Sequence, residues 1–397
     1  MQEKMYLPEN VEYLISRLNR RGYRADVVGG CVRDFLLGKE PNDYDITTDA
    51  TPDEMRCVFS DLHTVETGIK HGTLTVILDS EPYEITTYRV DGKYSDNRHP
   101  DSVSFTRRIS DDLSRRDFTV NAMSYNSKDG LCDLFCGKDD LENKVIRAVG
   151  DPTLRFTEDA LRILRALRFA SVLDFDIEEG TSKAIFERAH LLKNVSSERI
   201  YVEWHKLICG IGAYRILTKY STVISVIIPE LSSVKMCCEE EFLSSDLVIR
   251  ELSLFALSLE ELAPQGFYSA MSRLKSDNKH KLFGMTVLQN LHAPSDSEVA
   301  LRIMLVKNGK DVTEGVIKLK ILLGLSDRCE YNMLKDLLCR GVCYRVSDMK
   351  IDGNDLASIG LRGKEIGEVL TKLLYMIAEG KIENEREALL GQVASHL

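Results

Sequence analysis

The sequence has no apolar segment long enough to cross a membrane. Its most apolar stretch runs from Val223 to Ile228 and ends at Pro229, whereas a bilayer-spanning helix needs about 20 apolar residues. The first ten residues, MQEKMYLPEN, lack the apolar core of a signal peptide. We therefore expect neither secretion nor a membrane partner, and we expect the protein to work in the cytoplasm.

The cysteines lack any metal-binding or disulfide pattern. There are ten, irregularly spaced, and the pairs Cys132–Cys136 and Cys339–Cys343 are one residue too far apart for a C-x-x-C motif. This spacing argues against a zinc site and against a disulfide framework. We expect reduced thiols that mostly take part in packing.

Positive charge is in deficit, with 52 Lys and Arg against 62 Asp and Glu and a net charge of −10. A protein that coats nucleic acid nonspecifically needs many cations to displace counterions from phosphates, so this balance argues against such a coat. An RNA substrate requires the cations to cluster instead. They cluster in the first half of the chain, as Arg107, Arg108, Arg115, Arg116, Arg155, Arg162, Arg165 and Arg168.

Low-complexity segments and internal repeats are also absent. With 397 residues, of which 44% are hydrophobic and 29% charged, the chain is long enough for two to four domains with hydrophobic cores. Strand patterns occur only before about Asp151, and beyond it apolar residues recur at intervals of three and four. This change predicts an α+β protein, in which an α/β head with a small mixed sheet precedes all-α domains.

Residues 28–45, VGGCVRDFLLGKEPNDYD, open with a glycine turn. Val27 and Val28 predict the end of a strand, and Gly29 and Gly30 predict a turn into a helix, where backbone N–H groups can bind phosphate. Arg33 comes one helical turn later. A double glycine alone is more often a simple turn, so its significance depends on the residues after it.

The same stretch closes with two aspartates, Asp43 and Asp45. In an extended segment alternate side chains share a face, so both carboxylates point one way and Tyr44 points the other. Two such carboxylates can share divalent cations held roughly 3.5 to 4 Å apart. An isolated Asp-x-Asp is often a solvated loop, but together with the glycine turn it indicates metal-dependent nucleotide chemistry.

Residues 72–78 and 83–89 are rich in β-branched side chains and predict an antiparallel hairpin. Glu84 then shares a face with Thr86 and Tyr88. If this strand lies beside that of Asp45, Glu84 supplies a third carboxylate; the alternative is a solvent-facing glutamate. The polar segment Asp91–Asp101 predicts a mobile loop.

Two further blocks complete the pattern: RRDFTVNAM at residues 115–123 and EDALRILRALRF at residues 158–169. With G-G-x-x-R-D-x-L-L-G and D-x-D before them, they resemble the motifs of the class II CCA-adding enzymes and bacterial poly(A) polymerases. The resemblance is strongest from Val28 to Trp204, and residues 215–340 contain no recognisable motif. It implies a nucleotidyltransferase head (1–149), a base-selecting neck (150–212), a body (213–320) and a tRNA-binding tail (321–397).

The resemblance also implies roles for individual residues. Asp43 and Asp45 would bind Mg²⁺ and act in catalysis with Glu84. Arg116 would contact a nucleotide phosphate and Asp117 a ribose hydroxyl. The other nucleotide-binding residues would be Gly30 and Arg33 at the triphosphate, together with Asp159, Arg162, Arg165 and Arg168 in the neck.

Residues 158–169 predict one helix with Leu161, Leu164 and Leu167 facing inward. Asp159 and Arg162 are then one turn apart and can face the same ligand edge. Cytosine and adenine each present an amino donor beside a ring-nitrogen acceptor, whereas guanine and uracil reverse this order, so a carboxylate and a guanidinium can select the former pair. The alternative for Arg162 is a surface ion pair with Glu158. The alternative to nucleotide binding by Arg165 and Arg168 is that they brace the fold.

Two weaker motifs lie further along the chain. Residues 196–204, SSERIYVEW, are similar to the family's last head-and-neck motif, but we interpret them as a structural helix start. In the tail, glycine turns carry Arg362 and Lys364, which could bind RNA phosphates. No His-Asp dyad is present there, so we expect the phosphohydrolase domain of some relatives to be missing.

The resemblance therefore implies addition of C, C and A to the tRNA 3′ end from CTP and ATP without a nucleic-acid template. One alternative is a related polymerase that adds poly(A), only CC or only A; the intact loop at 91–101 and the lack of an extended basic C-terminus disfavour it. The other is a non-catalytic RNA-binding protein, which would need no carboxylates at positions 43, 45 and 84. The oligomeric state stays open.

Overall fold

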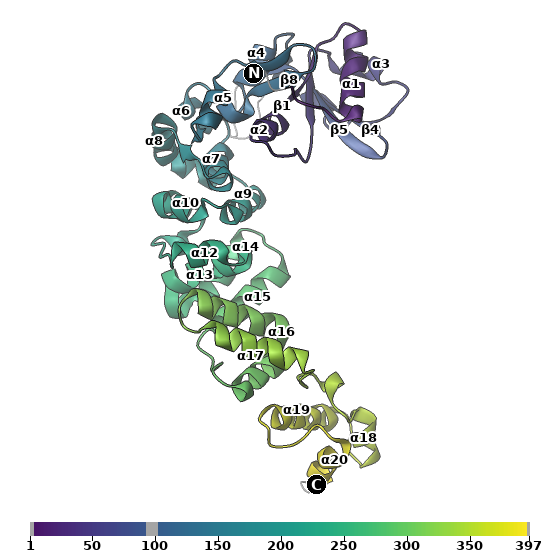
Figure 1. Ribbon diagram of the computed structural model, residues 1–397, viewed down its shortest axis with the longest axis vertical. Helices are drawn as coiled ribbons and strands as arrows, with labels where there is room; N and C mark the ends of the chain where they lie inside the picture. Colours follow the sequence, from purple (N-terminus) through teal and green to yellow (C-terminus); the bar gives the residue numbers. More distant parts are fainter. Residues whose placement is uncertain (1–3, 93–101, 395–397) are drawn as a thin grey trace. The chain divides into compact units, whose positions relative to one another are not determined.

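The computed structural model describes residues 4–92 and 102–394. The chain divides into two compact units, Met1–Ile227 and Ile228–Leu397 (Figure 1). The first contains the sheet and the second is helical, which confirms the predicted α+β class. The finer division into head, neck, body and tail stays a prediction.

A seven-stranded sheet forms the centre of the first unit, with the strand order β3-β4-β5-β2-β1-β8-β9. Strands β2 and β5 run parallel and the other neighbours are antiparallel, so the sheet is mixed, as predicted. The hairpin β4–β5 is confirmed, with both turn residues, Asp79 and Ser80, at positive φ. The strands are β1 (Ala25–Val28), β2 (Asp45–Thr48), β3 (His63–Val65), β4 (Thr73–Leu78), β5 (Glu81–Thr87), β8 (Met123–Asn126) and β9 (Gly130–Asp133).

Helices cover the sheet and continue beyond it in the same unit (Figure 1). They bury one apolar stripe each where they pack; α1, for example, buries Val11, Leu14, Ile15 and Leu18. The helices are α1 (Glu9–Arg20), α2 (Gly30–Leu36), α3 (Pro52–Val58), α4 (Ile109–Ser114), α5 (Gly137–Glu142), α6 (Pro152–Glu158), α7 (Leu161–Leu173), α8 (Glu179–Arg188), α9 (Ser197–Cys209), α10 (Ala213–Lys219) and α11 (Ser221–Ile227).

Three local predictions need correction. The helix expected over residues 158–169 is broken, because α6 ends at Glu158, Asp159 is extended (φ −132°, ψ 104°) and α7 begins at Leu161. A short strand, β11 (Asp176–Ile177), occurs after residue 151 and pairs in parallel with β10 (Val145–Ile146). Asp91 belongs to β6 (Arg89–Asp91), which pairs with β7 (Val103–Phe105); the rest of the expected loop, residues 93–101, lies outside the described residues.

The second unit is built from helices throughout its described part. Gly309, at φ 77°, kinks its longest helix, α16. Leu301 and Leu305 of α16 pack with Leu334 and Leu337 of α17 in one buried cluster. The helices are α12 (Glu239–Ser244), α13 (Leu247–Leu259), α14 (Ala263–Arg273), α15 (Asn278–Gln289), α16 (Glu298–Leu322), α17 (Arg328–Cys339), α18 (Gly353–Ser358), α19 (Lys364–Ala378) and α20 (Arg386–Ala394).

The ten cysteines are free. Only Cys31 and Cys343 are buried, however, and six are exposed, so the expectation of mostly packing thiols is wrong. Over residues 4–92 and 102–394, none of the helices is both long and apolar enough to span a bilayer.

A half-buried histidine makes the second unit's stability depend on pH. Nε2 of His280 on α15 lies 2.7 Å from Oε2 of the buried Glu251 on α13. Burial lowers the pKa of His280, but the hydrogen bond and charge of Glu251, with Asp277, outweigh burial and raise it above its ordinary value. A raised folded-state pKa adds stability that is complete below the unfolded pKa of about 6.5 and is lost as pH rises through the folded pKa.

We expect His280→Gln, which keeps a hydrogen-bond donor but cannot titrate, to remove this dependence. The difference in unfolding temperature between wild type and variant, in favour of the wild type, should be larger at about pH 5.5 than at about pH 9. Circular dichroism of the full chain measures it. The chain's one tryptophan, Trp204, lies buried in the first unit, so its fluorescence transition is the internal control. A difference between the proteins that stays constant with pH would contradict the assignment.

Candidate active site

Strand pairing places the predicted carboxylates side by side. Asp45 is the first residue of β2, and the parallel register Ile46↔Ile85 puts Glu84 of β5 next to it. On the other side Asp45 pairs with Val28, the last residue of β1 before the glycine turn. Asp43 lies two residues before β2, and all three carboxylates are exposed. The condition set for Glu84, that its strand lies beside that of Asp45, is therefore met.

The three carboxylates act on one another electrostatically. Partial desolvation and the charges of Asp43 and Glu84 raise the pKa of Asp45, against the lowering effect of Arg116. Behind them, burial raises the pKa of Cys31 to about 12, so this thiol stays protonated. The site thus presents a concentration of negative charge, with Arg116 as the cation that acts on Asp45.

These donors fit a hard divalent cation. Magnesium is commonly held by one or two carboxylates while substrate phosphates and water complete its shell, and Asp43 and Asp45 offer two accessible oxygen donors. In residues 4–92 and 102–394, no group of three His, Cys, Asp or Glu side chains is close enough to enclose a metal.

Cations surround the glycine turn, which opens α2 as predicted. Gly29 has φ 81°, and a Cβ there would lie 3.2 Å from Nη1 of Arg116. Gly30 is also close to a guanidinium, because a Cβ added at this position would lie 3.6 Å from Nη2 of Arg33. Nη1 of Arg33 also donates to Oδ1 of Asn121 at 2.7 Å. The predicted triphosphate contacts Gly30, Arg33 and Arg116 are thereby brought together at one turn.

Asp112, which the sequence patterns did not single out, holds Arg116 in this position. Its side chain is fully buried, and Oδ2 accepts a hydrogen bond from Nη2 of Arg116 at 3.2 Å, while Oδ1 accepts two from Arg115. Burial raises the pKa of Asp112, but the two guanidiniums reverse this effect and lower it. The buried carboxylate therefore stays charged and orients Arg116.

Asp117, the predicted ribose contact, is engaged in internal bonds. Oδ1 accepts the Phe118 N–H at 2.9 Å and the Asn121 amide at 3.2 Å, and Oδ2 is 2.6 Å from Nη2 of Arg165. Despite burial, these partners lower the pKa of Asp117. In this structure Asp117 links the head to α7, and a ribose contact would have to use a remaining lone pair.

Arg33, Arg165 and Arg168 gather around the ring of Phe169. Their guanidinium carbons lie 5.2, 5.4 and 3.8 Å from its centroid. Burial lowers the pKa of Arg168 most, and the neighbouring Arg165 and Arg33 add to the effect. Oε2 of Glu203 lies 2.9 Å from Nε of Arg168 and compensates part of the positive charge of these guanidiniums. The concentration of guanidiniums is suited to an anion such as a triphosphate.

Asp159 and Arg162 have separate partners. Nη1 of Arg162 donates to Glu158 at 2.8 Å, and its Nη2 donates to the carbonyl of Arg115 at 2.9 Å. The ion pair between Arg162 and Glu158 that the alternative interpretation expected is therefore present. The Arg162 side chain is only 11% exposed, however, so it does not lie on the surface. Asp159 accepts from Arg199 of α9 at 2.9 Å. Arg199 and Glu203 belong to the segment that we interpreted as structural, and no local pattern indicated their contacts with Asp159 and Arg168.

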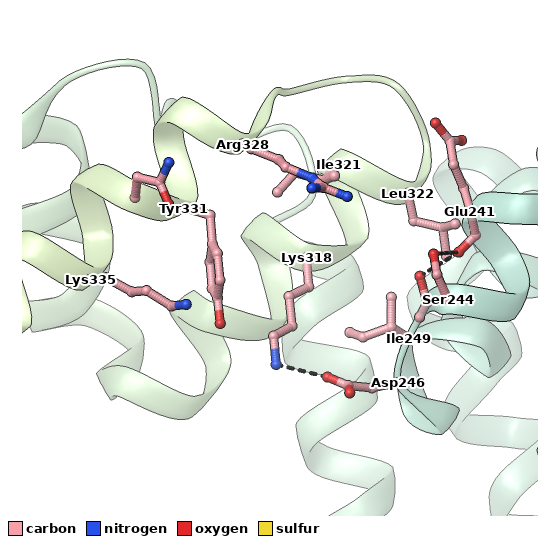
Figure 2. A pocket seen from close by; sticks show the side chains of 12 residues that line it. Glu241, Ser244, Asp246, Ile249, Lys318, Ile321, Leu322, Arg328, Tyr331 and Lys335 are labelled. Atoms are coloured by element: carbon pink, nitrogen blue, oxygen red, sulfur yellow. Dashed lines mark hydrogen bonds and ion pairs between the residues drawn. The ribbon is translucent and has the colours of Figure 1, made fainter.

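The second unit offers a hollow and exposed cations. A hollow of 490 Å³ lies between α12, α13, α16 and α17 (Figure 2). In it Lys318 is ion-paired with Asp246 at 2.7 Å, and Lys335 lies 4.4 Å from the Tyr331 ring centroid. In the tail, Arg362 and Lys364 are exposed, and Lys364 pairs with Glu368 at 3.0 Å. RNA binding by Arg362 and Lys364 stays a prediction.

Carboxylates on and beside the adjacent inner strands β2 and β5, next to a cation-rimmed glycine turn, are the arrangement expected of a nucleotidyltransferase site. Three family models match the chain: "Poly A polymerase head domain" at residues 25–147, "Probable RNA and SrmB- binding site of polymerase A" at 174–233, and "tRNA nucleotidyltransferase domain 2 putative" at 249–393. The protein is thus a nucleotidyltransferase with a head of the poly(A) polymerase type.

Relatives define the family more narrowly. A CCA-adding enzyme of Pediococcus pentosaceus is 35% identical over 392 residues, covering 97% of each protein, and one of Enterococcus faecalis is 35% identical over 389 residues, covering 95% of this chain and 93% of that one. The crystal structure of the Bacillus stearothermophilus CCA-adding enzyme in complex with CTP superimposes with a TM-score of 0.80 at 28% identity, covering 99% of each chain. The chain belongs to the family of CCA-adding enzymes.

Proposed function

We propose that this protein adds C, C and A to the 3′ end of tRNA, taking CTP and ATP as substrates without a nucleic-acid template. One observation carries the proposal: Asp45, on which the charges of Asp43 and Glu84 act, is also within electrostatic reach of Arg116, whose guanidinium lies beside the glycine turn. Such a site can bind a metal and a triphosphate together. The relatives named as CCA-adding enzymes match nearly the full chain.

Each group has a distinct task in nucleotide transfer. We assign Asp43 and Asp45 to Mg²⁺, which supplies Lewis acidity at the triphosphate and lowers the pKa of the attacking 3′-hydroxyl. Arg33 and Arg116, with the backbone at Gly30, bind the triphosphate and hold its α-phosphorus in line with that hydroxyl. Glu84 places a third negative charge beside Asp45.

Nucleotide selection belongs to the neck. We assign the Asp159 carboxylate to the amino group of cytosine or adenine and the Arg162 guanidinium to the adjacent ring nitrogen. Uracil and guanine would leave these groups unpaired, and each buried unpaired group costs roughly 1 to 3 kcal/mol. Arg165 and Arg168 add positive charge near the triphosphate while bracing Asp117 and Glu203.

The helical second unit would bind the body of the tRNA. Recognition of folded RNA depends mainly on shape and on contacts to phosphate and 2′-hydroxyl groups, for which exposed cations such as Arg362 and Lys364 are suited. Since tRNA, CTP and ATP are cytoplasmic substrates, we place the enzyme in the cytoplasm.

A nucleotide-by-nucleotide assay tests the function. The protein is incubated with Mg²⁺ and a tRNA that lacks its 3′-terminal CCA, first with each nucleoside triphosphate alone and then with CTP and ATP together. We expect growth by two C with CTP and by one A once both C are present, with no further extension. An unbounded A tail would indicate a poly(A) polymerase. Arrest after two C in the presence of both nucleotides would indicate a partial enzyme, and RNA binding without any extension would indicate a non-catalytic protein.

A further inference from the structure

Helix α9 carries two charged side chains of opposite sign toward residues assigned to nucleotide binding. Arg199 and Glu203 are four residues apart, so they lie on one face of the helix. Nη2 of Arg199 donates to Oδ2 of Asp159 at 2.9 Å, and Oε2 of Glu203 lies 2.9 Å from Nε of Arg168. The face of α9 that carries these two residues is therefore packed against the residues assigned to nucleotide binding.

The backbone of Asp159 is hydrogen-bonded to both neighbouring helices, but the direction of its side chain depends on the side chain's own partners. Asp159 occupies the extended link between α6 and α7, where the N–H of Leu161 donates to its Oδ1 at 3.1 Å. Burial lowers the pKa of Arg165, but Asp117, then Glu203 and, least of all, Asp159 raise it, so Arg165 is a second cation within electrostatic reach of Asp159. Without Arg199, the Asp159 carboxylate would be free to turn toward Arg165 and away from an incoming base.

We infer that Arg199 is a positioning residue for nucleotide selection. A carboxylate offers about four lone-pair sites; Arg199 and Leu161 occupy two of those on Asp159 and hold the carboxylate in place. The others stay available to the amino group of cytosine or adenine. This inference rests on the proposed function of Asp159 in base selection.

The test is a ratio of rates. In Arg199→Met we expect the preference for CTP over UTP, measured as the ratio of their kcat/KM values, to fall about tenfold, a common size for coupling between contacting residues. A ratio of this kind does not depend on the fraction of folded enzyme. Arg199→Lys keeps the charge but not the planar fork and should restore part of the preference.

Arg215→Met is the matched control. Arg215 pairs with Asp174 and Asp176 in the same unit, away from Asp159. We expect this substitution to leave the CTP-to-UTP ratio unchanged. A ratio that falls equally in both variants would show a general loosening of the neck and would overturn the inference.

A double variant separates the inference from the function beneath it. If Arg199 acts through Asp159, then Arg199→Met should change nothing further in an Asp159→Asn background. Two outcomes would overturn the role of Arg199 and leave the proposed function intact. In the first, the double variant loses as much of the CTP-to-UTP preference as the two single variants together. In the second, Arg199→Met keeps the normal ratio while Asp159→Asn lowers it. A normal ratio in Asp159→Asn itself would overturn base selection by Asp159.

Discussion

Replacing Asp43 by alanine should abolish nucleotide incorporation while leaving tRNA binding almost unchanged. Asp43 is exposed just before β2, and its charge acts on Asp45, so its removal takes one of two proposed metal donors without disturbing the buried core. We expect a loss of about 10³-fold or more, equivalent to about 4 kcal/mol of transition-state stabilisation. Single-turnover incorporation of CTP and a tRNA gel-shift measure the two effects separately.

Glu40→Ala is the control for Asp43→Ala. Glu40 is an exposed acid three residues earlier on the same loop, so its replacement removes the same charge outside the proposed metal site. The variant should incorporate CTP at nearly the wild-type rate. Retained turnover in Asp43→Ala would remove Asp43 from the metal site, and equal losses in both variants would assign the effect to general charge.

For Arg162→Ala we expect poor rejection of UTP and GTP. The Arg162 guanidinium is mostly buried and is the donor proposed to read the ring nitrogen of cytosine or adenine. Losing one buried donor that penalises a wrong base by roughly 1 to 3 kcal/mol should reduce discrimination about 5-fold to 150-fold. Competition between CTP and UTP, and between ATP and GTP, on the same tRNA measures it.

Arg155→Ala is the control for Arg162→Ala, because it removes an ion pair with Glu158 without removing Arg162. Both Arg155 and Arg162 bind Glu158, at 2.9 and 2.8 Å. If Arg162 mattered only as a surface partner of Glu158, the two substitutions would have similar, small effects on discrimination. Unaltered discrimination in Arg162→Ala would show that the neck helix is simply a charged surface.

Local sequence patterns predicted the elements around the candidate active site because their geometry is local. The strand ending at Val28, the glycine turn and the β4–β5 hairpin each depend on residues that are neighbours in sequence. Glu84 required one additional condition, the parallel pairing of β2 with β5, and the structure meets it. The roles of the individual site residues stay predictions that the substitutions at Asp43, Asp159 and Arg162 test.

The neck was less predictable because its contacts are distant in sequence. Residues 158–169 favour helix throughout, yet Asp159 leaves the helix and its side chain accepts the N–H of Leu161, a competition with helix that is typical of aspartate near helix starts. Arg199 meets Asp159 across 40 residues, through the packing of α9 on α7. No spacing within a single segment can indicate such a pair.

A crystal structure of the protein with CTP and Mg²⁺ tests the central claim most directly. We expect the triphosphate between the Gly29–Gly30 turn and Arg116, the metal on Asp43 and Asp45, and the cytosine edge against Asp159 and Arg162. A nucleotide bound elsewhere, or bound here with Asp43 and Asp45 turned away from the metal, would contradict it.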